Sequence, residues 1–250
     1  MGELLYLRYM KTIIAFIFLL SLRFSAYAQT EFILSDDLTY AVIKDSDGFV
    51  NIRKAPNTSS PIVGKIYKYN IFGCETNKTN WWKVLQVQND NHHKSNWLEG
   101  YIHKSRVSLL SGWKKINKKN VHKDSCVFKN DSLKVAVKKA TFNSRKHKLS
   151  YNKTELSLID GKVFWGTDGE VPKEVITSLK IIKNGQLIFI PTNAFNDLYE
   201  PRLETLSICH GPKNTTYISM SDSDGAGAYT IIWIFKDDKY YTRYIDDSMV

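Results

Sequence analysis

Cys209 and His210 are adjacent, and a thiol beside an imidazole is the pairing that a cysteine nucleophile and its base would use. Residues next to each other in a chain rarely face each other, however, and no motif places a second imidazole or carboxylate beside this pair. The chain also lacks the GxSxG, HExxH and phosphate-loop patterns. The sequence therefore assigns no catalytic residue and no cofactor, and we expect a protein that is not an enzyme.

Two acidic turns resemble the start of a calcium loop. They are Asp45-Ser46-Asp47-Gly48 and Asp222-Ser223-Asp224-Gly225. Neither is followed by the spaced acidic residue that closes such a loop, and the second runs into an apolar segment. Both are better interpreted as Asp-Gly turns, so no metal site is predicted.

Aromatic and basic side chains alternate in Trp81-Trp82-Lys83-Val84, a strand-like pattern. On a strand Trp81 and Lys83 share one face, and Val84 suits the core on the other. Tyr101 and His103 share the same parity on a later segment. We expect Trp81, Lys83, Tyr101 and His103 to form an outward-facing ligand-binding surface; the alternative is that these aromatic rings only cover the ends of the core.

The N-terminus has the order of a secretory signal. Lys11 precedes an apolar run, Thr12 to Leu22, and Ala26-Tyr27-Ala28 supplies small residues at the cleavage positions. As a helix this run would span roughly 16 Å, against about 30 Å of bilayer hydrocarbon, so cleavage is favoured over a membrane anchor. Residues 1–28 are predicted to be a signal peptide, which places the protein in the periplasm or outside the cell, with no membrane span after cleavage.

The rest of the chain suits a protein with a packed core. Hydrophobic residues make up 43% and charged residues 24% of the sequence. The net charge of +10 favours anionic partners, although solubility alone accounts for it. No arginine-rich recognition helix appears, so no specific nucleic-acid partner is predicted.

Short β-type runs separated by turn residues fill residues 40–110, as expected of a small barrel or sandwich. The lysine-rich stretch 111–124 is predicted to be a linker. Residues 125–250 form a second β-rich unit, either mainly β or α+β, with a short helix over Pro172 to Leu179 and a hairpin turn at Asn184-Gly185. The fold class is therefore mainly β.

Residues 40–110 also resemble a bacterial SH3 (SH3b) domain. The resemblance is carried by Val50-Asn51-Ile52-Arg53, Ile62-Val63-Gly64-Lys65-Ile66, Trp81-Trp82-Lys83-Val84 and Glu99-Gly100-Tyr101-Ile102, and the polar insert at Gln88 to Asn96 departs from it. The family implies a small SH3-like β-barrel, exported and attached to another domain, which often binds cell-wall peptides or other envelope ligands. The C-terminal half resembles only uncharacterised exported proteins, through the stretches 160–170 and 223–229.

Three cysteines are present: Cys74, Cys126 and Cys209. None lies in CxxC spacing, and export permits a disulfide. Cys126–Cys209 is the preferred pair because both lie in the same predicted domain, but the sequence leaves the pairing open.

These observations favour an exported, non-catalytic binding protein of the cell envelope, whose SH3b module recognises a peptide, peptidoglycan or an envelope protein. Two alternatives stay open. One is a cell-wall hydrolase with an active site in the C-terminal domain, using a carboxylate such as Asp168, Glu170 or Asp224. The other is a periplasmic inhibitor or immunity-type protein.

Overall fold

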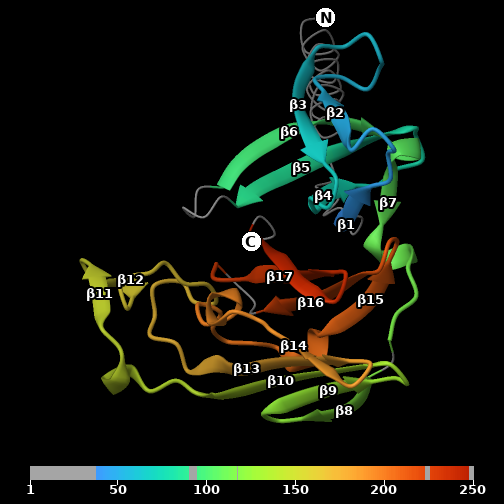
Figure 1. The fold of residues 1–250 in the computed structure, drawn as a ribbon. Coiled ribbons are helices and arrows are strands. Elements are labelled where there is room, and N and C mark those ends of the chain that lie inside the picture. The colour runs from blue at the N-terminus through green and yellow to red at the C-terminus, as the bar shows by residue number, and fades with distance from the viewer. Residues whose placement is uncertain (1–37, 90–94, 117, 223–225, 248–250) are drawn as a thin grey trace, which may run out of the picture. The chain divides into compact units, whose positions relative to one another are not determined.

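The computed structural model describes residues 38–89, 95–116, 118–222 and 226–247. The predicted signal peptide, residues 1–28, lies outside this range. The described residues form β-strands and short 3₁₀ helices, with no α-helix among them, which confirms the mainly β fold and not the α+β alternative (Figure 1). No helix in this part of the chain is long and apolar enough to cross a membrane.

The N-terminal strands form a seven-stranded antiparallel sheet in the order β3-β2-β6-β5-β4-β1-β7. Its core follows from alternation: in β2 the side chains of Val50 and Ile52 are buried while their neighbours are half-exposed. Ile66, Phe72 and Ile102 complete this core. The strands are β1 (Leu38–Ile43), β2 (Phe49–Arg53), β3 (Ile62–Tyr67), β4 (Phe72–Glu75), β5 (Trp81–Asn89), β6 (Ser95–His103) and β7 (Val107–Leu109).

A five-stranded sheet follows in the order β14-β13-β10-β9-β8. Its strands are β8 (Lys118–His122), β9 (Ser125–Lys129), β10 (Leu133–Thr141), β13 (Glu174–Lys183) and β14 (Gln186–Ile188). Two predictions were wrong here. Strand β8 occupies part of the predicted linker, because an edge strand tolerates lysines that discourage further pairing. Instead of the predicted helix over Pro172 to Leu179, the residues from Glu174 onward belong to β13, whose β-branched residues favour a strand.

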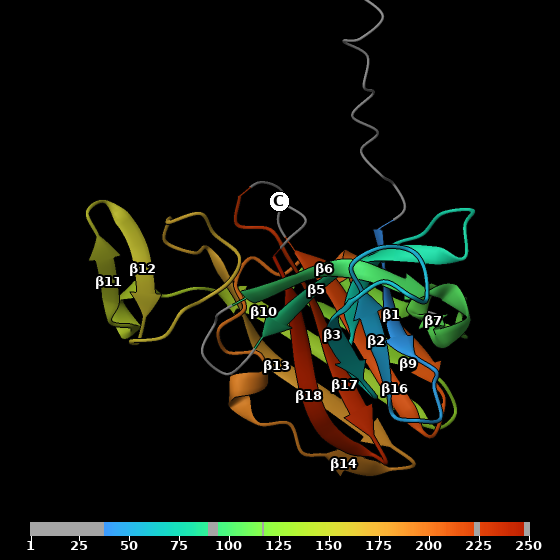
Figure 2. The ribbon, with the colours of Figure 1, turned by 90° about the horizontal axis from the view of Figure 1, so that it is seen from above.

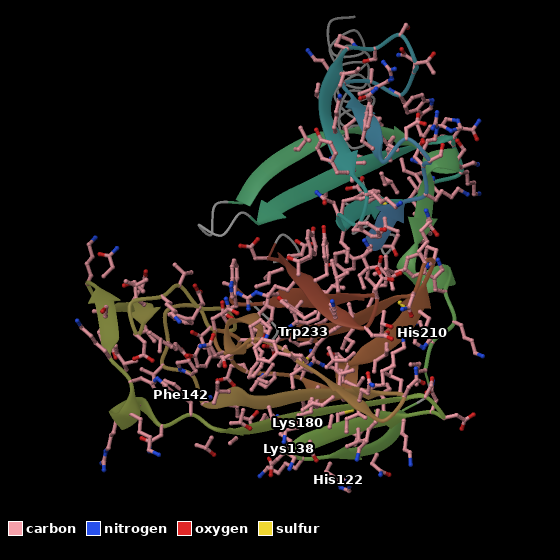
Figure 3. The ribbon with its side chains drawn as sticks, viewed as in Figure 1. His122, Lys138, Phe142, Lys180, His210 and Trp233 are labelled. Carbon is pink, nitrogen blue, oxygen red and sulfur yellow. The ribbon has the colours of Figure 1, made fainter. Side chains whose placement is uncertain are left out.

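The C-terminal strands form a four-stranded sheet in the order β15-β16-β17-β18. They are β15 (Ser207–Gly211), β16 (Thr215–Asp222), β17 (Tyr229–Lys236) and β18 (Lys239–Asp246). The largest core cluster joins this sheet to the five-stranded sheet, with Val135 and Ile181 from one and Ile218 and Trp233 from the other (Figure 3). Trp233 is fully buried, and its Nε1 donates to the carbonyl of Ala194 at 2.7 Å.

The four-stranded sheet packs against a neighbouring sheet on each of its two faces. The side chains of Tyr217, Ile232 and Ile234 point away from the cluster around Trp233 and pack instead against Val42 and Ile71 of the N-terminal sheet. This explains why Ile231 to Phe235 is a continuous apolar run rather than an alternating one: every residue in it is buried.

A small two-stranded arm and five 3₁₀ turns complete the description. The arm pairs β11 (Leu149–Asn152) with β12 (Glu155–Ile159) and is labelled in Figures 1 and 2. Its own core contains Phe142 and Tyr199, whose rings meet edge to face. The 3₁₀ turns are η1 (Lys104–Arg106), η2 (Leu110–Gly112), η3 (Ser144–Lys146), η4 (Thr192–Ala194) and η5 (Leu203–Thr205).

The predicted hairpin turn is confirmed. Asn184 and Gly185 both have positive φ, at 50° and 81°, and β13 pairs with β14 on either side of them. The preferred Cys126–Cys209 disulfide is wrong, because neither cysteine forms a disulfide and the two lie in different core clusters. Cys126 packs between the two C-terminal sheets, whereas Cys209 faces the N-terminal sheet.

Candidate functional site

A pocket of about 390 Å³ opens on the N-terminal sheet. It contains two of the four residues predicted from the sequence, Trp81 and His103. Lys83 and Tyr101 do not line it. The lining residues are Asp45, Asp47, Phe49, Val50, Asn51, Arg53, Thr58, Trp81, His103 and Arg106.

Cross-strand pairing brings the four predicted residues together. On β5 and β6, Trp81 lies opposite His103, and Lys83 lies opposite Tyr101. All four side chains are half-buried. The rings of Trp81 and His103 meet edge to face, with centroids 5.3 Å apart, so their contact builds one wall of the pocket. The pair Lys83–Tyr101 continues the same face two residues farther along.

The side chains predicted to point into the core from β5 are the ones that the structure buries. Val84 and Ile102 are fully buried, and Trp82 packs against the same core. Trp82 also donates from Nε1 to the carbonyl of Asn77 at 3.2 Å, which holds it on the inward face. Because Trp82 and Ile102 point into the core, alternation along the two strands directs the side chain of Trp81 to the outer face of the sheet.

The acidic turn 45–48 and η1 also line the pocket, through Asp45, Asp47 and Arg106. Asp45 forms an ion pair with Arg106, and the side chain of Asp45 is only 3% exposed. Asp45 Oδ1 also accepts from the backbone N–H of Asp47 at 3.0 Å, an Asx turn that fixes the loop before Gly48. The turn is thus a structural Asp-Gly turn, as its sequence suggests, and it also supplies charge to the pocket.

Arg53 is held by its own loop. Its Nη1 donates to the carbonyl of Ser60 at 2.7 Å, and the Ser60 hydroxyl accepts from the N–H of Ala55 at 2.8 Å. These bonds give Arg53 a structural role in the turn. Its guanidinium still borders the pocket, so the lining combines two carboxylates with two guanidinium groups.

Asn51 contributes a polar group that the fold does not satisfy. Its Oδ1 is buried and has no hydrogen-bond partner among the described residues. A buried acceptor without a donor costs on the order of 1–3 kcal/mol. A ligand donor reached by rotation of this carboxamide would recover that cost.

Sequence reasoning missed the contribution of β2 to this pocket. Phe49, Asn51 and Arg53 share the outward parity of β2, and the sheet order places β6 directly between β2 and β5. The alternation of Val50 and Ile52 predicts which residues of β2 face outward. It does not predict which strand lies beside β2, because that depends on the topology of the sheet.

A second pocket, of about 570 Å³, lies in the C-terminal half. It brings together the two stretches singled out in the sequence, through Asp168 and Glu170 from one and Ala226 and Gly227 from the other. Asp224 lies outside the described residues. The loops approach so closely that a Cβ on Gly227 would meet the backbone of Thr167 at 2.5 Å, so glycine is required there.

The charged groups of the second pocket are partly committed to one another. Lys139 Nζ pairs with Glu174 at 2.6 Å, and Arg202 pairs with Glu204 at 3.2 Å. Glu204 has a pKa below its usual value, because backbone and Arg202 hydrogen bonds favour the carboxylate. The lining of this pocket therefore contains ion pairs and, beside them, the exposed carboxylates of Asp168 and Glu170.

Cys209 and His210 do not form a nucleophile and base. They occupy adjacent positions on β15, and Cys209 is buried against the N-terminal sheet. Burial raises the pKa of the Cys209 thiol to about 11, which disfavours the thiolate. The Nδ1 of His210 instead contacts the hydroxyl of Thr216 at 3.2 Å. No group of three or more histidine, cysteine or acidic side chains in the described chain is placed to hold a metal ion.

Comparison of the chain with protein-family models, with curated proteins and with solved structures gives no match.

Proposed function

We propose that this protein is an exported, non-catalytic binding protein of the cell envelope, and that its N-terminal SH3-like unit recognises an extended peptide such as a cell-wall stem peptide. The observation that carries the proposal is the convergence of Phe49, Trp81 and His103 on one pocket of the N-terminal sheet. Aromatic faces are the usual means by which a shallow groove holds an extended chain.

The charges of the pocket favour a ligand of mixed charge. Its lining contains Asp47, the Asp45–Arg106 ion pair and Arg53. Peptides that carry both carboxylates and amines complement such a lining. A purely anionic polymer would instead be drawn by the net charge of +10, with no need for this pocket.

Co-sedimentation with isolated peptidoglycan tests the proposal, using the full chain in low and in high salt. Trp81→Ala removes an aromatic wall of the pocket. Tyr151→Ala is the matched control, because Tyr151 is 52% exposed on the separate β11–β12 arm. Salt-resistant binding that Trp81→Ala loses and Tyr151→Ala keeps would support recognition through the pocket.

Two results would argue against it. Binding that high salt abolishes and both variants retain is general attraction between a basic protein and an anionic polymer. An absence of binding would remove peptidoglycan as the ligand and direct attention to a protein partner, including the inhibitor alternative, which a stable stoichiometric complex would reveal.

A cell-wall hydrolase is the second candidate, and the second pocket is the observation that favours it. Asp168 and Glu170 border this pocket with three further glutamates, so a carboxylate pair for acid–base work is sterically available there. Release of soluble muropeptides by the full chain, abolished in Asp168→Asn or Glu170→Gln, would establish the hydrolase. Unchanged release in both variants would exclude these carboxylates.

A further inference from the structure

Two lysines lie over one tyrosine ring where the N-terminal sheet meets the C-terminal sheet, and a third lysine lies beside them. Lys236 Nζ lies 4.5 Å from the centroid of the Tyr69 ring, and Lys68 Nζ lies 5.3 Å from it. Lys213 lies close enough to Lys68 and Lys236 for both of their charges to act on its amine. The three residues come from separate elements: the β3–β4 turn, the β15–β16 turn and the end of β17.

The turns that present this cluster are strained. Tyr69 has φ of 72° and Lys213 has φ of 55°, in the left-handed region that residues with a Cβ avoid. Backbone strain of this kind concentrates at sites that bind ligands. The ring of Tyr69 is further fixed by edge contact with Tyr241, with centroids 5.8 Å apart.

The positive charge of the cluster is not neutralised within the described chain. None of the ion pairs found there includes Lys68, Lys213 or Lys236. The nearby Asp238 is committed to Lys183. The pKa of Lys213 lies below its usual value, first because of contact with the Lys68 amine and also because of the charge on Lys236.

We propose that Lys68, Lys213 and Lys236 form a binding site for a phosphate group at the junction of the two sheets. Lysine ammonium groups bind phosphate as compact point charges, and three of them complement the terminal oxygens of a dianion better than the two oxygens of a single carboxylate. The bound phosphate would relieve the repulsion among the lysines and link the turns that carry them.

Titration of the full chain with inorganic phosphate at constant ionic strength, followed by calorimetry and by thermal melting, tests this site. The triple variant Lys68→Gln, Lys213→Gln, Lys236→Gln removes the cluster. The matched control is Lys134→Gln, Lys148→Gln, Lys153→Gln, three exposed lysines of the C-terminal half that lose the same total charge.

We expect saturable binding by the wild type and the control, weakened at least tenfold in the cluster variant. The cluster variant should also melt at a higher temperature than the wild type in the absence of phosphate, because like charges have been removed. An absence of saturable binding by the wild type, or equal loss in both triple variants, would overturn the proposal.

A second arm distinguishes a free phosphate from a lipid headgroup. Vesicles of phosphatidylcholine containing phosphatidic acid are compared with vesicles of phosphatidylcholine alone. Vesicle binding that only the cluster variant loses would identify a lipid phosphate as the source. Binding of inorganic phosphate without vesicle binding would identify a soluble phosphate.

Discussion

Arg243 on β18 forms a two-pronged ion pair with Asp197 in the loop between β14 and β15. Its Nη1 and Nη2 donate to the two carboxylate oxygens of Asp197, both at 2.5 Å. The Asp197 side chain is only 10% exposed. The pair ties a long loop to the four-stranded sheet, and the same loop supplies Glu200 and Arg202 to the second pocket.

Removing one partner of this pair should be costly. We expect Asp197→Ala to lower the free energy of unfolding by about 3–5 kcal/mol, because the Arg243 guanidinium would remain buried and uncompensated. Chemical denaturation measures the change. The control is Glu204→Ala, which breaks the exposed pair with Arg202 and should cost less than about 1 kcal/mol. Equal effects of the two substitutions would contradict the structural role of Asp197.

The hairpin between β13 and β14 depends on its glycine. Gly185 has φ of 81°, and a Cβ there would meet nothing within 4 Å, so only backbone strain opposes a side chain. Gly185→Ala should therefore destabilise the protein by about 1–2 kcal/mol in a denaturant titration.

Gly112 is the matched control for that substitution. A Cβ there is also unobstructed, but Gly112 does not have a left-handed φ. Gly112→Ala should be neutral or stabilise by up to about 1 kcal/mol, through the lower entropy of the unfolded chain. Destabilisation by Gly112→Ala equal to that of Gly185→Ala would show that the sign of φ is not the cause.

Local patterns predicted the strands well but predicted their partners poorly. The Asn184-Gly185 turn and the inward direction of Val84 were readable, because turn chemistry and alternation act within a few residues. The edge strand β8 was missed because its lysines suit a linker equally well. The first half of strand β13 was missed because Pro172 suggested the first turn of a helix, whereas cross-strand pairing with β10 decides the outcome.

The candidate site divides in the same way. Trp81 and His103 were found from strand parity alone. Phe49 and Asn51 were not, since only the order β2-β6-β5 places them beside those rings. The SH3-like identity of the N-terminal unit stays a prediction from the sequence.

The two faces of β17 give a direct test of the contact between the N-terminal and C-terminal sheets. Ile232 packs in the cluster with Val42 of β1, whereas its neighbour Ile231 packs on the opposite face, toward the five-stranded sheet. Ile232→Ala and Ile231→Ala should each cost about 2–5 kcal/mol. In double-mutant cycles with Val42→Ala, Ile232→Ala should show a coupling energy of at least about 0.5 kcal/mol, and Ile231→Ala should be additive. Coupling of both, or of neither, would contradict the two-faced packing of β17.

His210 gives the protein a pH dependence of defined sign. The pKa of its imidazole lies below 6.5, first because of burial and then because of the charges on Lys183 and Lys114. The unfolded chain therefore binds a proton more readily than the folded chain. The contribution of His210 to the free energy of unfolding is therefore fully present above a pH of about 6.5, and it is lost as the pH falls through the lower pKa of the folded state.

Titration of the His210 ring resonances by NMR measures this pKa. Lys114→Gln should raise it, since one of the opposing charges is removed, while Lys134→Gln on the exposed face of β10 should leave it unchanged. The variant His210→Gln should lose the part of the acid destabilisation that the imidazole causes. A His210 pKa at or above 6.5 in the folded protein, or one that Lys114→Gln does not move, would show that burial and these lysines do not control its protonation.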